Sequence, residues 1–414
     1  MRLLLKQQDC HETWSYTIIV PMKILYFDQK EIEDIDLLWG FVELGYDVRK
    51  GDYLVPDAEY TEEDVTAICK ELGDAELIAT KDFSAAVAEA CHLENRIYLS
   101  WVHDSPQRAL YMREAQYDTN IIFLFDRAQV ERLSMMHIPH LYHAPLATNI
   151  TRASTLHISD EDIRHFSTDI AFVGSMYLYK DRTTFFSSLS SDTRTELEAI
   201  MNHKIGFWDD EHTLFCPFSE SAMRDMSLHL SRQEPRLYAF SDEYLIQTLA
   251  LCRETATRER LLLLDTLSKK HSVALYTDEP EFAAEKLPDV QVHGRAHYAT
   301  DALKVFYSSR VNLNITIPSI ESGVPLRIYD IMGVGGFVMS NNQSEAHELF
   351  VPDREIVLFS CMDELEEKAA YYLLHDKQRT RIAMSGYQRV LKDYNIPNAV
   401  KRMVDKTRSV FGIR

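Results

Sequence analysis

Residues 311–340 contain side chains whose types and spacing suit the binding of a phosphate. The stretch reads VNLNITIPSIESGVPLRIYDIMGVGGFVMS, in which an apolar run ends near Ile317 and a short loop leads to Pro325. Proline is favoured in the first turn of a helix, where its missing N–H costs little. The loop amides and the positive end of that helix would then point to one place, which favours an anion. Gly323 would let the backbone approach such a ligand closely.

Two charged side chains follow on the same predicted helix. Arg327 lies in the first turn, where its guanidinium can give two parallel hydrogen bonds to a phosphate. Asp330 comes about one turn later and is placed to accept hydrogen bonds from vicinal hydroxyls. A phosphate beside a diol indicates a nucleotide. The alternative is a helix end built for stability, in which Arg327 and Asp330 form an i,i+3 ion pair worth only tenths of a kcal/mol.

Short apolar runs that alternate with helical stretches predict two doubly wound α/β units. Strands are expected at 22–28, 45–48, 76–80, 96–102 and 120–125, and then at 169–175, 272–276, 290–293, 311–317, 336–340 and 356–359. The stretch from about 181 to 264 is mostly helical, and so is the chain beyond residue 362, apart from a break near Pro397. Ligands of open α/β sheets bind at the carboxyl ends of strands, so the facing edges of the two units are where chemistry is expected.

These residues resemble the CgeB-like (spore-maturation type) GT-B glycosyltransferases, which are related to the retaining family-four glycosyltransferases. That group carries a loop Glu, a Gly-containing turn, an acidic residue, small residues and a Gly before the next strand. The chain shows, in that order, Pro318-Ser319, Glu321, Gly323, Asp330, Ile331, Met332 and Gly335. The resemblance covers most of residues 22–395, including the segments HGRAHYATDALKVFYSSRVNLNITIPS, FVGSMYLYKDR, MSGYQRV, YLSWVHDSP and YHAPLA. Residues 190–255 match least.

The resemblance implies a role for each matching residue. It assigns catalysis to His103, Glu321 and Arg327. It assigns donor binding to Gly174, Ser175, Lys180 or Arg182, Gly294, Arg295, Ser322, Gly323, Val324 and Asp330. Asp330 stands where the family has Glu and would bind the ribose, whereas the Glu321–Gly323 loop amides would hold the diphosphate and sugar. Two features depart from the family pattern: the two acidic residues are one position further apart than usual, and Arg327 stands where many members have Pro.

His103 also has a structural interpretation. It follows the predicted strand in WVHDSPQ, and the family places such a His over the donor sugar. Alternatively, Asp104 caps a helix, with Gln107 three residues later completing a capping box and Pro106 in the first turn. His103 would then be only the last residue of a strand.

The domain organisation expected from the resemblance is that of a GT-B enzyme with two Rossmann-like domains facing a cleft. We expect an extension over 1–21, an acceptor-side domain over 22–150 and a linker over 151–168. The donor domain would cover 169–395, with a helical insertion at about 190–255. Residues 396–414 would form a helix that packs back on the N-terminal domain.

The implied activity is transfer of a sugar from a UDP-, GDP- or dTDP-linked donor to an acceptor hydroxyl, with retention of configuration and without a metal or other cofactor. Two alternatives remain at this point: a nucleotide-sugar epimerase of the same fold, and a protein that binds sugar nucleotides without turnover. No GxGxxG follows the strands at 24–27 or 170–173, which argues against a dehydrogenase, and no GxxxxGK[ST] indicates a P-loop.

Composition restricts partners and location. The 414 residues include 64 acidic and 44 basic side chains, and the net charge of −20 repels nucleic acids and anionic membranes. The six cysteines show no zinc spacing, which favours free thiols in a reducing compartment. No apolar run approaches the roughly 20 residues of a membrane span, and the first 21 residues lack the pattern of a signal peptide. We therefore expect a cytoplasmic protein without an integral membrane segment.

Overall fold

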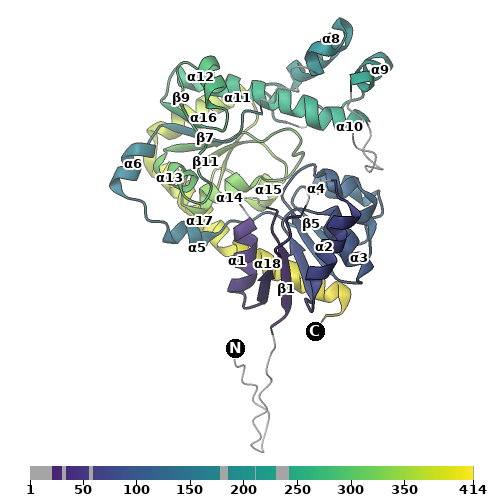
Figure 1. The fold of residues 1–414 in the computed structure, drawn as a ribbon. Helices are drawn as coiled ribbons and strands as arrows, with labels where there is room; N and C mark the ends of the chain where they lie inside the picture. The colour runs from purple at the N-terminus through teal and green to yellow at the C-terminus, as the bar shows by residue number, and fades with distance from the viewer. Residues whose placement is uncertain are drawn as a thin grey trace, which may run out of the picture.

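The computed structural model describes residues 21–29, 34–55, 59–177, 185–209, 211–229 and 242–413. In these residues the chain builds two parallel six-stranded sheets with helices around them (Figure 1). This confirms the α/β class and the two doubly wound units expected from the sequence.

The first sheet has the order β2-β1-β3-β4-β5-β6. All residues of β3, β4 and β5 are buried, as expected for parallel strands covered on both faces. Its strands are β1 (Lys23–Phe27), β2 (Asp47–Lys50), β3 (Leu77–Thr80), β4 (Tyr98–Val102), β5 (Asn120–Leu124) and β6 (Leu141–His143). Its helices are α1 (Asp34–Glu43), α2 (Glu62–Leu72), α3 (Ala85–Leu93), α4 (Arg127–Ser134) and the 3₁₀ turns η1 (Arg108–Tyr111) and η2 (Arg113–Gln116).

The expected linker contains two short helices, α5 (Ile150–Thr155) and α6 (Asp160–Phe166). Local capping explains α6, because Ser159 and Asp162 form a complete capping box at its start. The polar character of this stretch therefore reflects exposed helices rather than an irregular connection.

The second sheet has the order β12-β11-β10-β7-β8-β9, the Rossmann arrangement in which successive strands are added first on one side of β7 and then, from β10, on the other side. Its strands are β7 (Ile170–Val173), β8 (Val273–Tyr276), β9 (Gln291–His293), β10 (Val311–Asn314), β11 (Val338–Asn341) and β12 (Val357–Phe359). The covering helices are α12 (Pro280–Lys286), α13 (Asp301–Ser308), α14 (Leu326–Gly333), α15 (Ala346–Leu349), α16 (Met362–Leu374) and α17 (Asp376–Asp393).

A helical insertion separates β7 from β8. It comprises α8 (Ser191–Lys204), α9 (Glu220–His229), α10 (Asp242–Ile246), the π-helical turn η3 (Gln247–Leu251) and α11 (Cys252–Ser268). In Figure 1, α8 and α9 project beyond the second sheet, while α11 lies along it. The buried apolar side chains of the insertion form a small core of their own, so it is a packed unit rather than a long loop.

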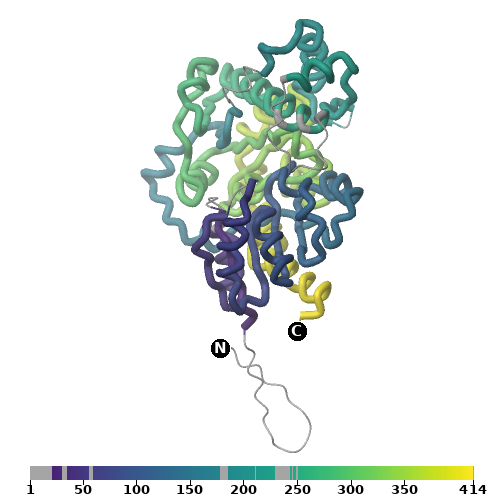
Figure 2. Tube along the Cα trace, turned by 45° about the vertical axis from the view of Figure 1, so that its right-hand side comes forward, coloured from purple at the N-terminus to yellow at the C-terminus, as the bar shows by residue number. Residues whose placement is uncertain are grey.

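The C-terminal helix α18 (Ile396–Phe411) returns to the first half of the chain, where it lies beside α1 (Figures 1 and 2). Asn395 caps its start, and a proline lies in its first turn.

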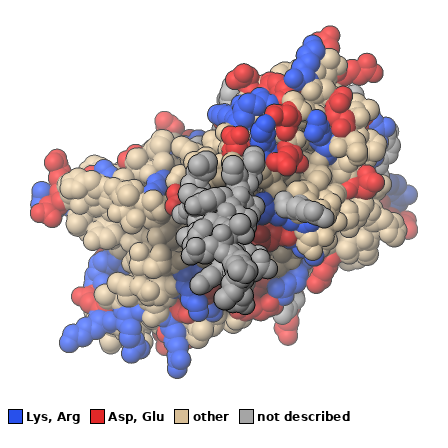
Figure 3. All heavy atoms as spheres, turned by 90° about the horizontal axis from the view of Figure 1, so that it is seen from below, with Lys and Arg blue, Asp and Glu red and all other residues tan. Residues whose placement is uncertain are grey.

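No helix in the described ranges has both the length and the apolar character needed to cross a membrane. Seen from below, acidic and basic side chains of the described residues lie among one another (Figure 3).

Candidate functional site

A cavity of about 370 Å³ lies at the carboxyl ends of β7 and β8, beside the first turn of α14. We call it the switch-point cavity, because it lies where the order of the second sheet reverses between β7 and β10. Open α/β sheets bind their ligands at such a point. Five of the residues to which the resemblance assigns a role line it, namely Gly174, Ser175, Arg295, Arg327 and Asp330.

Arg327 is a partly buried cation in the wall of this cavity. Its Nη1 donates to Oδ1 of the buried Asn314 at 2.9 Å, and its guanidinium carbon lies 5.1 Å from the ring centroid of Phe172. A Cβ on Gly174 would lie 2.7 Å from Arg327 Nη2, so the glycine is needed for this close approach. Burial, together with nearby Arg260, lowers the pKa of Arg327 to about 10, which still leaves it charged at neutral pH. Among the described residues, no carboxylate forms an ion pair with Arg327.

Arg260 of α11 is a second buried guanidinium at the same place, and sequence reasoning missed it. Only 1% of Arg260 is exposed, and it donates to the backbone oxygens of Ser175 and, at 2.7 Å, of Ile315. It therefore ties the segment after β7 to the segment after β10. The only local signal was a charged pair, Glu259-Arg260, directly before four apolar residues of a helical stretch.

Asp330 lines the switch-point cavity and also contacts the segment between the two sheets. Its side chain is buried, and its Oδ1 accepts a hydrogen bond of 2.6 Å from the Thr148 hydroxyl. Arg152 Nη2 lies 4.0 Å from the same oxygen, while Arg152 Nη1 lies 2.9 Å from Oδ2 of Asp36. Tyr298 also donates to Asp36, at 3.1 Å. Asp330 therefore contacts residues that precede the second sheet, and it does not form an ion pair with Arg327, one turn earlier on α14.

The amides of the loop before α14 do not point into an open site. Asp126, which follows β5 of the first sheet, is fully buried, and its carboxylate accepts from the backbone N–H of Glu321 at 2.9 Å and of Ser322 at 3.1 Å. The hydroxyls of Ser322 and Ser105 each donate to the same carboxylate at 2.8 Å. In this arrangement of the two halves, a protein carboxylate occupies the amide cradle where the sequence had suggested a diphosphate.

Gly323 and Val324 belong to this contact between the halves rather than to the cavity wall. A Cβ on Gly323 would lie 2.8 Å from the ring of Phe125, so the glycine is required by packing. Val324 is buried. Pro325 differs slightly from expectation, because it precedes the helix as its N-cap and α14 begins at Leu326.

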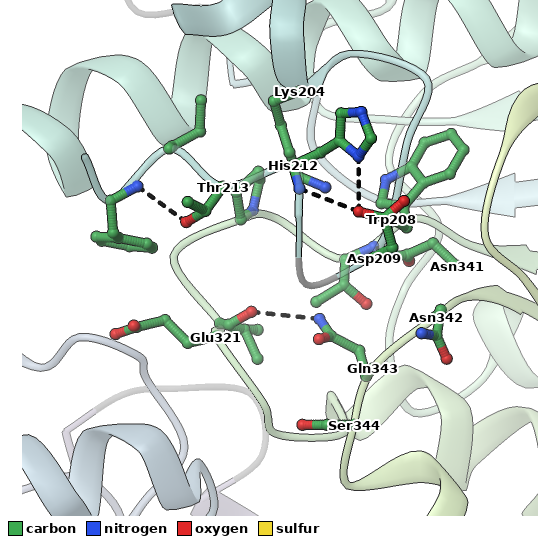
Figure 4. A pocket seen from close by; sticks show the side chains of 15 residues that line it. Lys204, Trp208, Asp209, His212, Thr213, Glu321, Asn341, Asn342, Gln343 and Ser344 are labelled. Atoms are coloured by element: carbon green, nitrogen blue, oxygen red, sulfur yellow. Dashed lines mark hydrogen bonds and ion pairs between the residues drawn. The ribbon is translucent and has the colours of Figure 1, made fainter.

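Glu321 lies away from Arg327 and Asp330. Both of its carboxylate oxygens accept from Arg132 Nη2 of α4 at 2.8 Å, and Oε1 also accepts from Gln129 at 2.7 Å. Burial raises the pKa of Glu321, and the hydrogen bond from Arg132 opposes this rise. The residue lines a second cavity of about 220 Å³, between the loop after β10 and the helical insertion (Figure 4).

The remaining residues from the sequence analysis lie apart from the switch-point cavity or cannot be placed. His103 follows β4, where its backbone N–H donates to Asp82 at 2.6 Å and its ring meets Trp101 edge-on. The proposed capping box at Asp104 does not form, because the Gln107 side chain hydrogen-bonds to the backbone of Phe83. Gly294 is exposed next to Arg295. Lys180 and Arg182 lie outside the described residues.

Comparisons with known proteins agree with this architecture. Residues 258–405 match a family model described as "Glycosyl transferase-like", whereas no curated protein sequence matches the chain. A glycosyltransferase from Rickettsia africae is similar in structure, with a TM-score of 0.57 at 10% identity, over 95% of this chain and 100% of that one. HepE from Anabaena in complex with UDP-glucose has a TM-score of 0.54 at 11% identity, over 94% of this chain and 100% of that one. Sucrose-phosphate synthase from Thermosynechococcus elongatus has a TM-score of 0.55 at 10% identity, over 95% of this chain and 100% of that one. The chain therefore has the GT-B fold.

Proposed function

We propose that this protein is a glycosyltransferase that moves a sugar from a nucleoside-diphosphate sugar to an acceptor hydroxyl. The observation that carries the proposal is Arg327, a partly buried cation in the wall of the cavity at the switch point of the second sheet, with no carboxylate ion-pair partner among the described residues. Arg260 lies behind it and donates to the backbone oxygens of Ser175 and Ile315. A desolvated cation is costly without a counter-ion, so a bound anion explains Arg327 better than stability does.

The chemistry of the transfer fits these groups. The bond between the anomeric carbon and the diphosphate breaks, the acceptor oxygen bonds to the same carbon, and the acceptor proton ends on the diphosphate. Negative charge grows on the leaving group, and Arg327 can stabilise it by preorganised electrostatics without a metal ion. Arg260 acts through the backbone of Ser175 and is a positioning residue. We infer retention of configuration and front-face attack, as in the CgeB-like group that the sequence resembles.

The GT-B fold and the family match over 258–405 support this proposal, and the UDP-glucose bound to the Anabaena protein suggests UDP as the first nucleotide to test. Product analysis with the donor alone separates the alternatives. An epimerase converts the donor into its epimer, and a non-catalytic binding protein leaves it unchanged even with acceptors. We expect transfer only with an acceptor, at a rate that EDTA does not change.

The substitution Arg327→Met tests the donor site directly. Charge-assisted hydrogen bonds to phosphate contribute about 1.5–3 kcal/mol, so the Kd for the preferred nucleoside diphosphate should rise roughly 10- to 100-fold. Calorimetry with UDP, GDP and dTDP measures this. Arg354→Met is the matched control, because Arg354 is an exposed arginine of the same half.

The free energy of unfolding of Arg327→Met distinguishes the loss of a ligand contact from the loss of the folded structure. Replacement of Arg327 removes its hydrogen bond to the buried Asn314, so the free energy of unfolding should fall by about 1–3 kcal/mol while the protein stays folded, and calorimetry is done on the folded variant. Wild-type affinity in Arg327→Met, or a wild-type protein that binds none of the three nucleotides, would contradict the proposed donor site.

A further inference from the structure

The second cavity, which we call the insertion pocket, lies under the helical insertion at the carboxyl ends of β10 and β11. It shares no lining residue with the switch-point cavity. Figure 4 shows His212, Asp209 and Lys204 of the insertion on one side and Asn342, Gln343 and Ser344 of the sheet's loops on the other. The carboxyl edge of an α/β sheet is where ligands bind, so this position favours a ligand rather than a packing defect.

Three consecutive side-chain amides form the base of the pocket, and each uses only one of its ends within the protein. Asn341 Oδ1 accepts from the Thr316 backbone N–H at 2.7 Å, and Gln343 Nε2 donates to a backbone oxygen at 3.2 Å. Asn342 Oδ1 lies 2.7 Å from His347 Nε2. Within the described ranges, Asn341 Nδ2, Asn342 Nδ2 and Gln343 Oε1 have no hydrogen-bond partner, although Asn341 and Gln343 are only 2% and 8% exposed.

This set of donors and an acceptor suits hydroxyl groups. A hydroxyl can accept from one amide and donate to another, whereas a phosphate or carboxylate can only accept. The unused ends of Asn341, Asn342 and Gln343 are not closed off from solvent, so a ligand or water in the pocket can bond to them. The base of the pocket therefore favours a ligand that carries several hydroxyls.

The charges around the pocket are compensated, which argues against an ionic ligand. Arg132 neutralises Glu321, while Lys204 and His212 both lie near the carboxylate of Asp209, with His212 Nδ1 at 2.6 Å from its oxygen. Apolar side chains complete the wall and offer a surface for the C–H groups of a ring; these are Trp208, Leu214, Phe215, Pro318 and Ile320. The volume of about 220 Å³ suits one ring rather than a long chain.

We propose that the insertion pocket binds a neutral saccharide unit of the acceptor. This inference rests on the proposed function for the identity of the acceptor, but the binding itself can be measured without a donor. It assigns a purpose to the insertion, whose sequence matched the CgeB-like group least.

Saturation-transfer NMR on the full chain tests the site with glucose, galactose, mannose and N-acetylglucosamine as probes. The substitutions Asn341→Asp and Asn342→Asp keep the oxygen that each side chain uses within the protein but remove the amide donors. We expect binding of at least one sugar to weaken about 3- to 10-fold in each variant, the effect of one lost hydrogen bond. Asn202→Asp is the control, because Asn202 is exposed on α8 of the same insertion and undergoes the same change of charge.

The outcomes separate this inference from the donor site. Weakened sugar binding in the two variants, with Asn202→Asp unchanged, supports a saccharide in the insertion pocket. If none of the four sugars shows a saturation-transfer signal with the wild type, or if Asn342→Asp binds the sugars as tightly as the wild type does, the inference is overturned. Binding of UDP, GDP and dTDP is measured in parallel: absence of binding to all three contradicts the proposed donor site, whereas nucleotide binding without sugar binding contradicts the insertion pocket alone.

Discussion

Glu259 shows how a single buried charge sets a pH dependence. Its side chain is fully buried in α11, and burial raises its pKa to about 7, although the charge of nearby Lys204 opposes this. The folded protein therefore holds a proton that the unfolded chain has already released above about pH 4.5. Stability should fall as the pH rises from about 4.5 to 7, by on the order of 3 kcal/mol, and then stay level with respect to this group.

Glu259→Gln should remove this pH-dependent loss, because the amide does not ionise. Urea unfolding at pH 5 and pH 7.5 measures it, with Glu367→Gln, at an exposed position of α16, as the control. A wild-type protein equally stable at both pH values would show that Glu259 remains ionised.

At the scale of elements, α1 and α18 approach closely because α1 has a glycine at the contact. A Cβ on Gly40 would lie 2.5 Å from Ile396 Cγ2 and 2.9 Å from Val400 Cγ2. Gly40→Ala should therefore overpack this interface and lower the free energy of unfolding by about 1–3 kcal/mol. The matched control is Gly294→Ala, since nothing lies within 4 Å of a Cβ there. Denaturant titration of both variants compares them, and equal stability would mean that the helices separate without cost.

At the scale of the whole molecule, Asp126 holds the carboxyl edges of the two sheets together. Its buried carboxylate receives two amide and two hydroxyl hydrogen bonds, three of them from the second half of the chain. Asp126→Ala should lower the free energy of unfolding by about 3 kcal/mol and shift the halves toward a more open arrangement. Urea unfolding and small-angle X-ray scattering test this, with Asp118→Ala, at an exposed position, as the control. An unchanged radius of gyration and unchanged stability would contradict such a role.

The positions of the strands and of the helix behind Pro325 follow from local patterns in the sequence. A buried parallel strand needs a short apolar run, and a helix start needs a cap or a proline within a few residues, so neighbouring residues are sufficient to predict them. The structure places Gly174, Ser175, Arg295, Arg327 and Asp330 around one cavity, since the carboxyl ends of neighbouring parallel strands share an edge, and the roles that the resemblance gives them stay predictions.

Only the tertiary structure decided which group accepts hydrogen bonds from the backbone amides of the loop before α14. Asp126 and Glu321 are 195 residues apart, and no periodicity or spacing reports a contact over that distance. The same reason hid Arg260, whose guanidinium reaches backbone oxygens 85 and 55 residues away. A hydrogen-bonding group in a sequence has many candidate partners, and the packing of the two halves selects among them. The sequence alone therefore determined which elements form, and the fold determined which of the predicted ligand sites remain open.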